Sequence, residues 1–579
     1  MIYDIILKNY LDNFSEDFNY KLKEPEQFER FVNYIVFSRQ YVNKITPDLI
    51  DIVSTGNGQD TGFDGIGIIV NGSLIRNISE LEYFLEKDYN LKISFIFVQT
   101  KARSHFRAES VGHFYDGIKN FFKHESLLTE NEEIKNFREI KNKIYDNTLK
   151  FDGNPDLYTY YATAGEWKEP KDINAKKLDF LDNMKKEKIF NNINSYFIDT
   201  DKLKLWYQEI KRKNIKEINF INKVALPDIS DVTQSFIGSL PMDEFIKMIT
   251  DSDGNLQKNL FDDNVRHFQG KTNKINNEIE DTLKDKSIQG ALPIFNNGIT
   301  VITKKLEQTG NKLRLTDFQI VNGCQSAHVF FNNKDIIDAK TNIIIKIIET
   351  NNSNLINKII KATNKQTLVT DEAFESLAAF HRNLEEYYDA RASKISIPIY
   401  YERRSKQYEN DPRKIKSVQI VTLAGQVQAF VATVLAQPHS THRYYGELLN
   451  GNRDKLFQEN LTSDLYYISS LILNRIDNLF RSKKINSKYR NYRFQIAYLA
   501  YNYLQELKHR DKKINYDKII LMLDNIDEYK EIFDLCCKII DEESNKYKHR
   551  DKKELHLYRL SKFTESLREN IQNQFKGVK

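Results

Sequence analysis

The chain has 579 residues, of which 40% are apolar and 29% charged, and its formal net charge is +5. This is the composition of a globular protein with enough apolar material for a core. No run approaches about 18 uninterrupted apolar residues, which argues against a transmembrane helix. The opening MIYDIILKNYLDNF lacks the basic region and cleavage site of a signal peptide. The three cysteines, two of them adjacent, argue against a disulfide framework. We therefore expect a cytoplasmic protein without a membrane partner.

The first 225 residues predict a mixed α/β domain. Phe28, Phe31, Val32 and Ile35 recur at helical spacing and predict a helix over 24–44. Further elements are expected as strands at 49–55, 65–70 and 73–75, a helix at 78–87, a strand at 95–101, a helix at 108–123, an exposed helical insertion at 125–150, and strands at 157–165 and 194–199. The order helix, three strands, helix, strand predicts an αβββαβ core with helices on the sheet faces.

Two further domains are expected. Between 226 and 412, apolar runs predict the strands of a mixed α/β domain: GITVIT (298–303), FQIVNG (318–323), NIIIKII (342–348) and ISIPIYY (395–401). Residues 413–579 read as helical, because apolar residues from Leu465 to Leu479 fall on one helical stripe. The predicted fold class is therefore an α/β (α+β) multidomain protein with a helical C-terminal domain.

The strand at 95–101, within FIFVQTKAR, ends on two polar side chains. Gln99 and Lys101 are two residues apart, and this spacing places both on the same face of a strand. Asp64 stands at the head of the middle hairpin strand, and Glu29 lies on the first helix beside its apolar stripe. These four side chains can converge at one edge of the sheet.

Such a set suits phosphodiester hydrolysis. Carboxylate and amide oxygens are the hard ligands that Mg²⁺ prefers, and a bound metal activates water and stabilises charge on a phosphate. Lys101 beside it could orient or deprotonate the attacking water, or hold the developing oxyanion. A strand end that simply emerges into solvent would give the same short motif, so the motif alone leaves both interpretations open.

With the surrounding residues included, the segment resembles a known family. FERFV in the first helix, GFDGIGI, FVQTKAR and the following helix are similar to the PD-(D/E)xK nuclease fold, in particular to Mrr-like restriction endonucleases. The resemblance covers about residues 20–170 and implies a catalytic site of Glu29, Asp64, Gln99 and Lys101. It also implies that Asp64, Gln99 and Glu29 bind Mg²⁺ or Mn²⁺. Because Gln99 is neutral where the family often has an acid, one metal is easier to hold than two.

A second group of motifs lies in the central region. NNGITVI (296–302), QIVNGCQSAH (319–328), KATNKQ (361–366), YYERR (400–404) and DNVRHFQG (263–270) closely resemble the abortive-infection phage-resistance family, abbreviated AIPR. The resemblance runs from about 255 to 450 and implies bacterial defence against phage. Members often carry a nuclease-like domain ahead of this region, as this chain does.

The residues themselves allow two interpretations of the central motifs. The Asn-Gly pairs are typical of tight turns. Alternatively, IVNGCQ is a strand, a glycine break and a helix start, whose backbone N–H groups suit an anion. The candidate ligand- or nucleic-acid-binding residues are Asn297, Asn322, Gly323, Gln325, Asn364, Gln366, Arg403 and Arg404.

A basic segment lies in the C-terminal domain. Residues 481–510 contain eight Lys or Arg and one acidic residue, and basic and aromatic side chains alternate in SKYRNYRF. The candidate patch is Lys483, Lys484, Lys488, Arg490 and Arg493. Such a patch can neutralise phosphates and stack on bases, but a solvated helix face has the same composition.

Together these features predict a metal-dependent endonuclease that hydrolyses DNA in phage defence. RNA is left open as a substrate, a nucleotide or phage-derived molecule as a trigger, and a homodimer as the assembly. The alternative is a non-catalytic nucleic-acid- or nucleotide-binding sensor that retains the nuclease fold. The sequence favours the enzyme because Glu29, Asp64 and Lys101 are all present.

Overall fold

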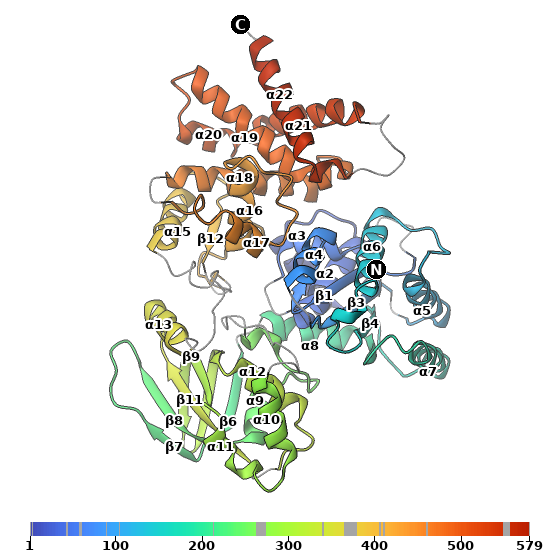
Figure 1. Ribbon diagram of the computed structural model, residues 1–579, viewed down its shortest axis with the longest axis vertical. Coiled ribbons are helices and arrows are strands. Elements are labelled where there is room, and N and C mark those ends of the chain that lie inside the picture. Colours follow the sequence, from blue (N-terminus) through green and yellow to red (C-terminus); the bar gives the residue numbers. More distant parts are fainter. Residues whose placement is uncertain are drawn as a thin grey trace. The chain divides into compact units, whose positions relative to one another are not determined.

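The computed structural model of the protein describes residues 2, 4–41, 45–56, 61–87, 90–103, 105–211, 214–261, 274–338, 341–363, 379–403, 407–408, 411–458, 461–547 and 556–577. The chain divides into two compact units, and Figure 1 labels their helices and strands. Unit 1 comprises residues 1–11, 24–45 and 49–373. Unit 2 comprises residues 12–23, 46–48 and 374–579, so two short N-terminal segments belong to the C-terminal unit.

The first part of unit 1 is a five-stranded sheet of order β2-β1-β3-β4-β5 with its helices. β1 is antiparallel to β2 and β3, whereas β3, β4 and β5 are parallel. The elements are α1 (Ile5–Asp17), α2 (Glu24–Gln40), α3 (Pro47–Val53), β1 (Gly65–Val70), β2 (Ser73–Leu74), α4 (Ile78–Lys87), β3 (Ile93–Lys101), α5 (Ala108–Phe122), α6 (Glu132–Tyr145), β4 (Asp156–Thr163), α7 (Lys171–Lys186), β5 (Ile193–Ile198) and α8 (Thr200–Lys211). All of β1 and most of β3 are buried, as expected of strands covered on both faces.

A second sheet in unit 1 has six strands in the order β6-β10-β9-β11-β8-β7. Its elements are β6 (Ile215–Asn219), β7 (Asn222–Ala225), β8 (Gln234–Pro241), α9 (Met242–Ile249), α10 (Lys274–Lys284), α11 (Leu292–Phe295), β9 (Ile299–Thr309), β10 (Lys312–Asn322), α12 (Cys324–Asn332), β11 (Asn342–Glu349) and α13 (Ser353–Thr363). β9 and β10 form an antiparallel hairpin, and β11 runs parallel to β9. The hairpin turn falls at Gly310, and the other end of the pair, at Asn322 and Thr300, holds the Asn-Gly motifs.

Unit 2 is mainly helical, as predicted. Its elements are α15 (Ala379–Ala392), β12 (Tyr400–Glu402), β13 (Ile420–Thr422), α16 (Leu423–Thr433), α17 (Tyr445–Gly451), α18 (Ser463–Arg481), α19 (Arg493–Arg510), α20 (Tyr516–Met522), α21 (Ile526–Asn545) and α22 (Ser561–Gly577). The apolar stripe of α18 is buried in its core. Arg475 on α18 is fully buried and donates to the backbone oxygens of Leu523 and Ile397, each at 2.7 Å. None of the helices in the described part of the chain combines the length and apolar character that crossing a bilayer requires.

Most predicted elements are confirmed, but the structure corrects some of them. The strand expected at 49–55 is the helix α3. Pro47 stands at the first position of this helix, where its missing N–H costs nothing, and the Thr46 hydroxyl contacts Asp48 at 2.5 Å. Ile50 and Val53 are buried one turn apart. The apolar spacing therefore fits one short helix as well as an alternating strand. The strand expected at 395–401 is also shorter, because β12 begins only at Tyr400.

The expected exposed insertion at 125–150 is wrong as well. It contains α6, one face of which is buried through Ile134, Phe137, Ile140 and Ile144. Polar groups on this face cap the end of α5: Arg138 pairs with Glu130 and donates to the Phe121 oxygen at 2.9 Å. The ammonium of Lys141 donates to the Lys123 oxygen at 2.8 Å.

Burial of Lys141 predicts a pH dependence of stability. Desolvation is the main cause that lowers the pKa of Lys141 from 10.5 to about 8, and nearby Arg138 adds to it. Between these values the unfolded chain holds a proton that the folded chain does not, so the free energy of unfolding should rise with pH from about 8 to 10.5. Lys141→Met should flatten this rise in denaturant titrations, whereas Lys135→Met, an exposed position of the same helix, should not. Parallel curves for wild type and Lys141→Met would refute the assignment.

Candidate functional site

The structure brings Asp64 and Gln99 into direct contact. Asp64 immediately precedes β1, its N–H donates to the Val98 oxygen at 2.8 Å, and it therefore lies beside the end of β3. Gln99 Nε2 donates to Asp64 Oδ2 at 2.6 Å. Both side chains are buried, with Asp64 9% and Gln99 3% exposed. The convergence expected from the sequence is thus present for this pair.

Asp64 Oδ2 accepts two more hydrogen bonds, both from Thr100, the residue after Gln99. The Thr100 N–H lies at 2.8 Å and the Thr100 hydroxyl at 2.7 Å. Since the second Gln99 amide proton is directed to the Thr100 oxygen at 3.1 Å, the oxygen Oε1 is the part of Gln99 that can meet a ligand. The sequence reading missed Thr100, although its place between the two motif residues was a signal.

Helix α2 adds two polar side chains to this edge. A Cβ on Gly56 would lie 2.2 Å from Glu29 Oε2, so the buried Glu29 carboxylate packs directly on the Gly56 backbone. One turn further along α2, the Asn33 side chain donates to the backbone oxygen of Asp64 at 3.1 Å and to Ser54 Oγ at 2.8 Å. The Thr55 N–H also donates to the backbone oxygen of Asp64, at 3.1 Å.

The segment 54–56 therefore adjoins the Glu29 carboxylate and the backbone of Asp64. The structure brings Glu29 to this segment; its convergence with the Asp64 and Gln99 side chains stays a prediction. Asn33 was missed. Its signal is that a polar residue four positions after Glu29 lies on the same helical face.

Lys101 ends β3 two residues beyond Gln99 and is half-buried. Alternation along the strand places the two side chains on one face, and in the parallel pairing Gln99 is opposite Tyr161 and Lys101 opposite Thr163. Within the described ranges, no hydrogen bond or ion pair of the Lys101 ammonium is found. Its side chain therefore lies on the face of β3 that carries Gln99, without a carboxylate partner among the described residues.

The donor set suits a hard cation held in part by water or substrate. Asp64, Gln99 and Glu29 offer oxygen ligands, which Mg²⁺ prefers, and Mg²⁺ commonly uses only one or two carboxylates besides waters and phosphates. In the described part of the chain, no cluster of three or more His, Cys, Asp or Glu residues that could hold a metal is found. The oxygen donors are of the kind that Mg²⁺ prefers, and metal binding at this site stays a prediction.

The motifs of the central region meet at two glycines, Gly323 and Gly298, which are close in space but distant in sequence. Gly323 has φ +91° and stands between β10 and α12. A Cβ on it would lie 2.3 Å from Ile299 Cδ1 and 3.2 Å from the Gly298 oxygen. Gly298 also has a positive φ, of +80°. The turn therefore requires glycine both for its conformation and for the close backbone approach.

The polar residues of this turn have structural partners. Asn322 donates to the Thr363 oxygen at 2.5 Å, and the buried Gln325 accepts from Asn276 at 3.2 Å. Asn297 is exposed, while its neighbour Asn296 accepts from the Gly298 N–H at 2.9 Å. Asn322, Gly323 and Gln325 thus share one strand-to-helix turn, which is the arrangement predicted for them.

The other residues predicted for this pocket are not placed there. Asn364, Gln366 and Arg404 lie outside the described residues. Arg403 belongs to unit 2, where its Nε donates to Glu385 Oε2 at 2.9 Å. A common pocket of these residues with the turn stays a prediction.

The predicted basic patch is divided between exposed and neutralised side chains. Lys483 and Lys484 are exposed, and Lys488 pairs with Asp541 at 3.0 Å. The Arg490 guanidinium lies 5.6 Å over the Phe480 ring. Arg493 turns into a cleft of unit 2. A role of these five residues in nucleic-acid binding stays a prediction.

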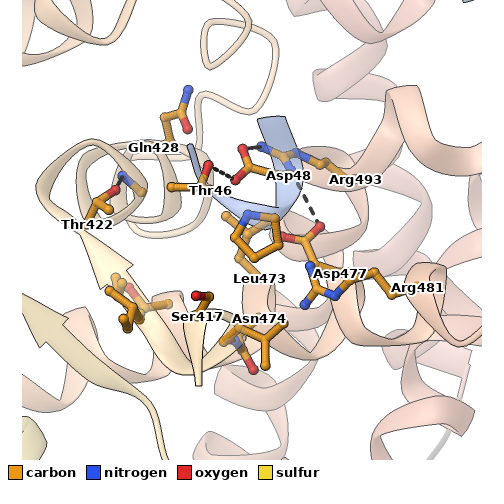
Figure 2. Close-up of a pocket in the computed structure, with 16 residues that line it drawn as sticks. Thr46, Asp48, Ser417, Thr422, Gln428, Leu473, Asn474, Asp477, Arg481 and Arg493 are labelled. Atoms are coloured by element: carbon orange, nitrogen blue, oxygen red, sulfur yellow. Dashed lines mark hydrogen bonds and ion pairs between the residues drawn. The ribbon is translucent and has the colours of Figure 1, made fainter. Parts of the chain in front are cut away.

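Figure 2 shows that cleft, a cavity of about 90 Å³. Arg493 lies between two carboxylates, at 3.8 Å from Asp48 and 3.5 Å from Asp477. Burial raises the pKa of Asp477, while Arg493 and Arg481 act in the opposite direction. Because the two arginines face two aspartates, the lining of the cleft has no net charge, and Arg493 serves there as an ion-pair partner.

The comparisons with known proteins give one match. A family model described as AIPR protein matches residues 261–552, which are 292 of the 579 residues and include the Asn322–Gly323 turn. No curated protein and no solved structure matches the chain.

The Gly323 turn allows a matched test. Gly323→Ala introduces a Cβ at positive φ against Ile299 and Gly298, whereas Gly310, at φ +61°, has open space around its Cβ position. Gly323→Ala should lower the free energy of unfolding by about 1–3 kcal/mol more than Gly310→Ala, since only the first adds a packing clash to the backbone strain. Urea titrations of the two variants check this. If both variants lost the same free energy of unfolding, Ile299 and Gly298 would have moved aside without an energetic penalty.

Proposed function

Because this chain belongs to the AIPR family, membership of which suggests a role in phage defence, we propose that it is a cytoplasmic, metal-dependent endonuclease that cuts DNA during that defence. The catalytic residues are Asp64, Gln99, Lys101 and Glu29. Mg²⁺ or Mn²⁺ is the cofactor.

The contact between Asp64 and Gln99 carries this proposal. It joins a carboxylate and an amide at 2.6 Å at the end of a buried strand, with an ammonium two residues further on the same face. A strand end that merely met solvent would have no reason to bury an acid and to direct three donors to one of its oxygens. Burial of a carboxylate is unfavourable unless hydrogen bonds offset it, so this edge is arranged around Asp64.

Each residue has a chemical role in the proposal. A bound Mg²⁺ would lower the pKa of a water and stabilise negative charge on the phosphate. Asp64 and Gln99 Oε1 would hold the cation, and Glu29 would orient its waters. Lys101 would donate to the phosphate oxygen or accept a proton from the attacking water. Thr100 holds the carboxylate of Asp64, and Asn33 holds its backbone oxygen.

The rival function is a sensor that binds nucleic acid without cutting it. It is supported by the saturation of Asp64 Oδ2 with three protein donors and by the neutral Gln99. Both features weaken metal binding relative to a pair of carboxylates. Homodimer formation and a nucleotide or phage-derived trigger also stay predictions.

A cleavage assay separates the two functions. Purified chain is incubated with plasmid, linear DNA and RNA, with Mg²⁺, with Mn²⁺ or with a chelator. Wild type should cut DNA only with metal, and Lys101→Ala should lose about 10²-fold or more of the rate, a typical contribution of acid–base catalysis. Asp64→Asn should be equally inactive, although it can keep an oxygen on the Thr100 donors. Lys185→Gln, an exposed position on α7, serves as the control. Equal cleavage by all four proteins would indicate a contaminating nuclease.

Metal binding can be tested without cleavage. Gln99→Glu places a second carboxylate against Asp64, so repulsion should lower the thermal unfolding midpoint in chelator. Mn²⁺ should then raise this midpoint more for Gln99→Glu than for wild type, because a cation relieves the repulsion. Gln325→Glu, which changes a buried amide on α12, should show no such recovery. If Mn²⁺ left the thermal unfolding midpoint of Gln99→Glu unchanged, the metal assignment would be contradicted.

A further inference from the structure

A row of basic side chains continues from the candidate site. Lys101, Arg103, His105 and Arg107 occupy every second position, and no acidic residue lies between 101 and 107. Arg103, His105 and Arg107 are exposed, and Arg107 has an extended backbone just before α5. We call these four residues the basic row.

An aromatic anchor fixes the row at this end of the sheet. Phe106 lies between two members of the row, and its ring is 4.8 Å from Trp167, 5.8 Å from Phe197 and 6.0 Å from Tyr161. Trp167 in turn stacks on Phe197 at 4.2 Å. Phe106 is held in this cluster, and its neighbours His105 and Arg107 are exposed to solvent.

Tyr161 connects the anchor to the candidate site. In the sheet it is paired with Gln99, which contacts Asp64. Burial raises the pKa of Tyr161 to about 12; Asp64 acts in the same direction and Arg103 and Arg107 oppose it. One buried hydroxyl thus lies within electrostatic range of Asp64 and of both arginines.

The charges of the row are not compensated by neighbouring acids. Within the described residues, Arg103 and Arg107 form no ion pair. The nearest acid in sequence, Glu109, is 87% exposed at its side chain and lies 3.9 Å from His113. By contrast, Arg493 and Lys488 of the C-terminal patch each have a carboxylate partner.

We propose that Arg103 and Arg107 bind the phosphates of a DNA backbone and seat it against the Asp64–Gln99 pair. The proposal rests on the nuclease function above and adds how the substrate is held. Guanidinium groups are suited to phosphate oxygens. The contacts carry no sequence information, because phosphate contacts position a duplex whereas base contacts specify it. Phe106, which lies between two members of the row, packs on Trp167 and Phe197 and is not offered to bases.

The test measures binding of the full chain, in chelator, to two short DNA duplexes of unrelated sequence. Fluorescence anisotropy is recorded between about 50 and 200 mM salt. Arg103→Gln with Arg107→Gln should weaken binding about 10-fold or more at the low salt and reduce the slope of log affinity against log salt by ~2, because two phosphate contacts are lost. Both duplexes should respond equally.

Three comparisons make the result decisive. Arg103→Lys with Arg107→Lys keeps the charges and should retain most of the slope. Lys185→Gln with Lys188→Gln removes two exposed charges at the end of α7 and should leave binding unchanged. Thermal unfolding of each variant shows that folding is intact. The proposal would be overturned if Arg103→Gln with Arg107→Gln left the slope of log affinity against log salt unchanged. It would also be overturned if wild type bound neither duplex. Since no cleavage is required, these results are independent of whether the chain cuts DNA.

Discussion

The hydrogen bonds to Asp64 Oδ2 are the constraint on which the first sheet and the candidate site both depend. A buried carboxylate is tolerated only when donors replace its water, and here Gln99, the Thr100 N–H and the Thr100 hydroxyl supply them. All three donors come from the end of β3, while the carboxylate comes from the start of β1. Asp64 therefore fixes the register of β1 and β3 at the same place where its carboxylate belongs to the candidate site. This explains why an apolar strand ends on polar side chains.

Polar contacts of different kinds hold helix α2 in its middle and at its C-terminal end. In its middle, Glu29 and Asn33 enter spaces that Gly56 and Gly65 leave open, since a Cβ on either glycine would meet their side chains within 2.3 Å. At its end, Arg39 lies 4.3 Å over the Trp206 ring, contacts Glu209 and Asp251, and pairs with Asp253 at 3.0 Å. Asp251 and Asp253 follow α9 of the second sheet. The helix that carries Glu29 thus links the candidate site to the segment that follows α9.

The sequence predicts most of this architecture where the signal is local. Long apolar strands such as β1 and β3 are recognisable because burial on both faces leaves no polar interruption, and the meeting of Asp64 with Gln99 follows from their places at adjacent strand ends. The short segment 49–55 is ambiguous, because one helical turn and a brief alternation present the same apolar residues. Partners distant in sequence account for the other errors. Asn33 acts on the backbone of Asp64, and Arg493 is neutralised by Asp48, so neither role is visible in a window of neighbouring residues.

The neutral Gln99 changes the electrostatic balance of the candidate site. Two carboxylates in contact would repel each other and would need a cation or a proton to stay together. An amide instead donates to Asp64, so the edge is ordered by the protein itself, and a cation finds less negative charge there. On the proposed function, the missing charge has to be replaced by oxygens of water and of the substrate phosphate. Arg103 and Arg107 bring a phosphate to this place, and the phosphate in turn adds the negative oxygens that Gln99 lacks. Binding of substrate and of metal should therefore reinforce each other, and neither should be tight alone.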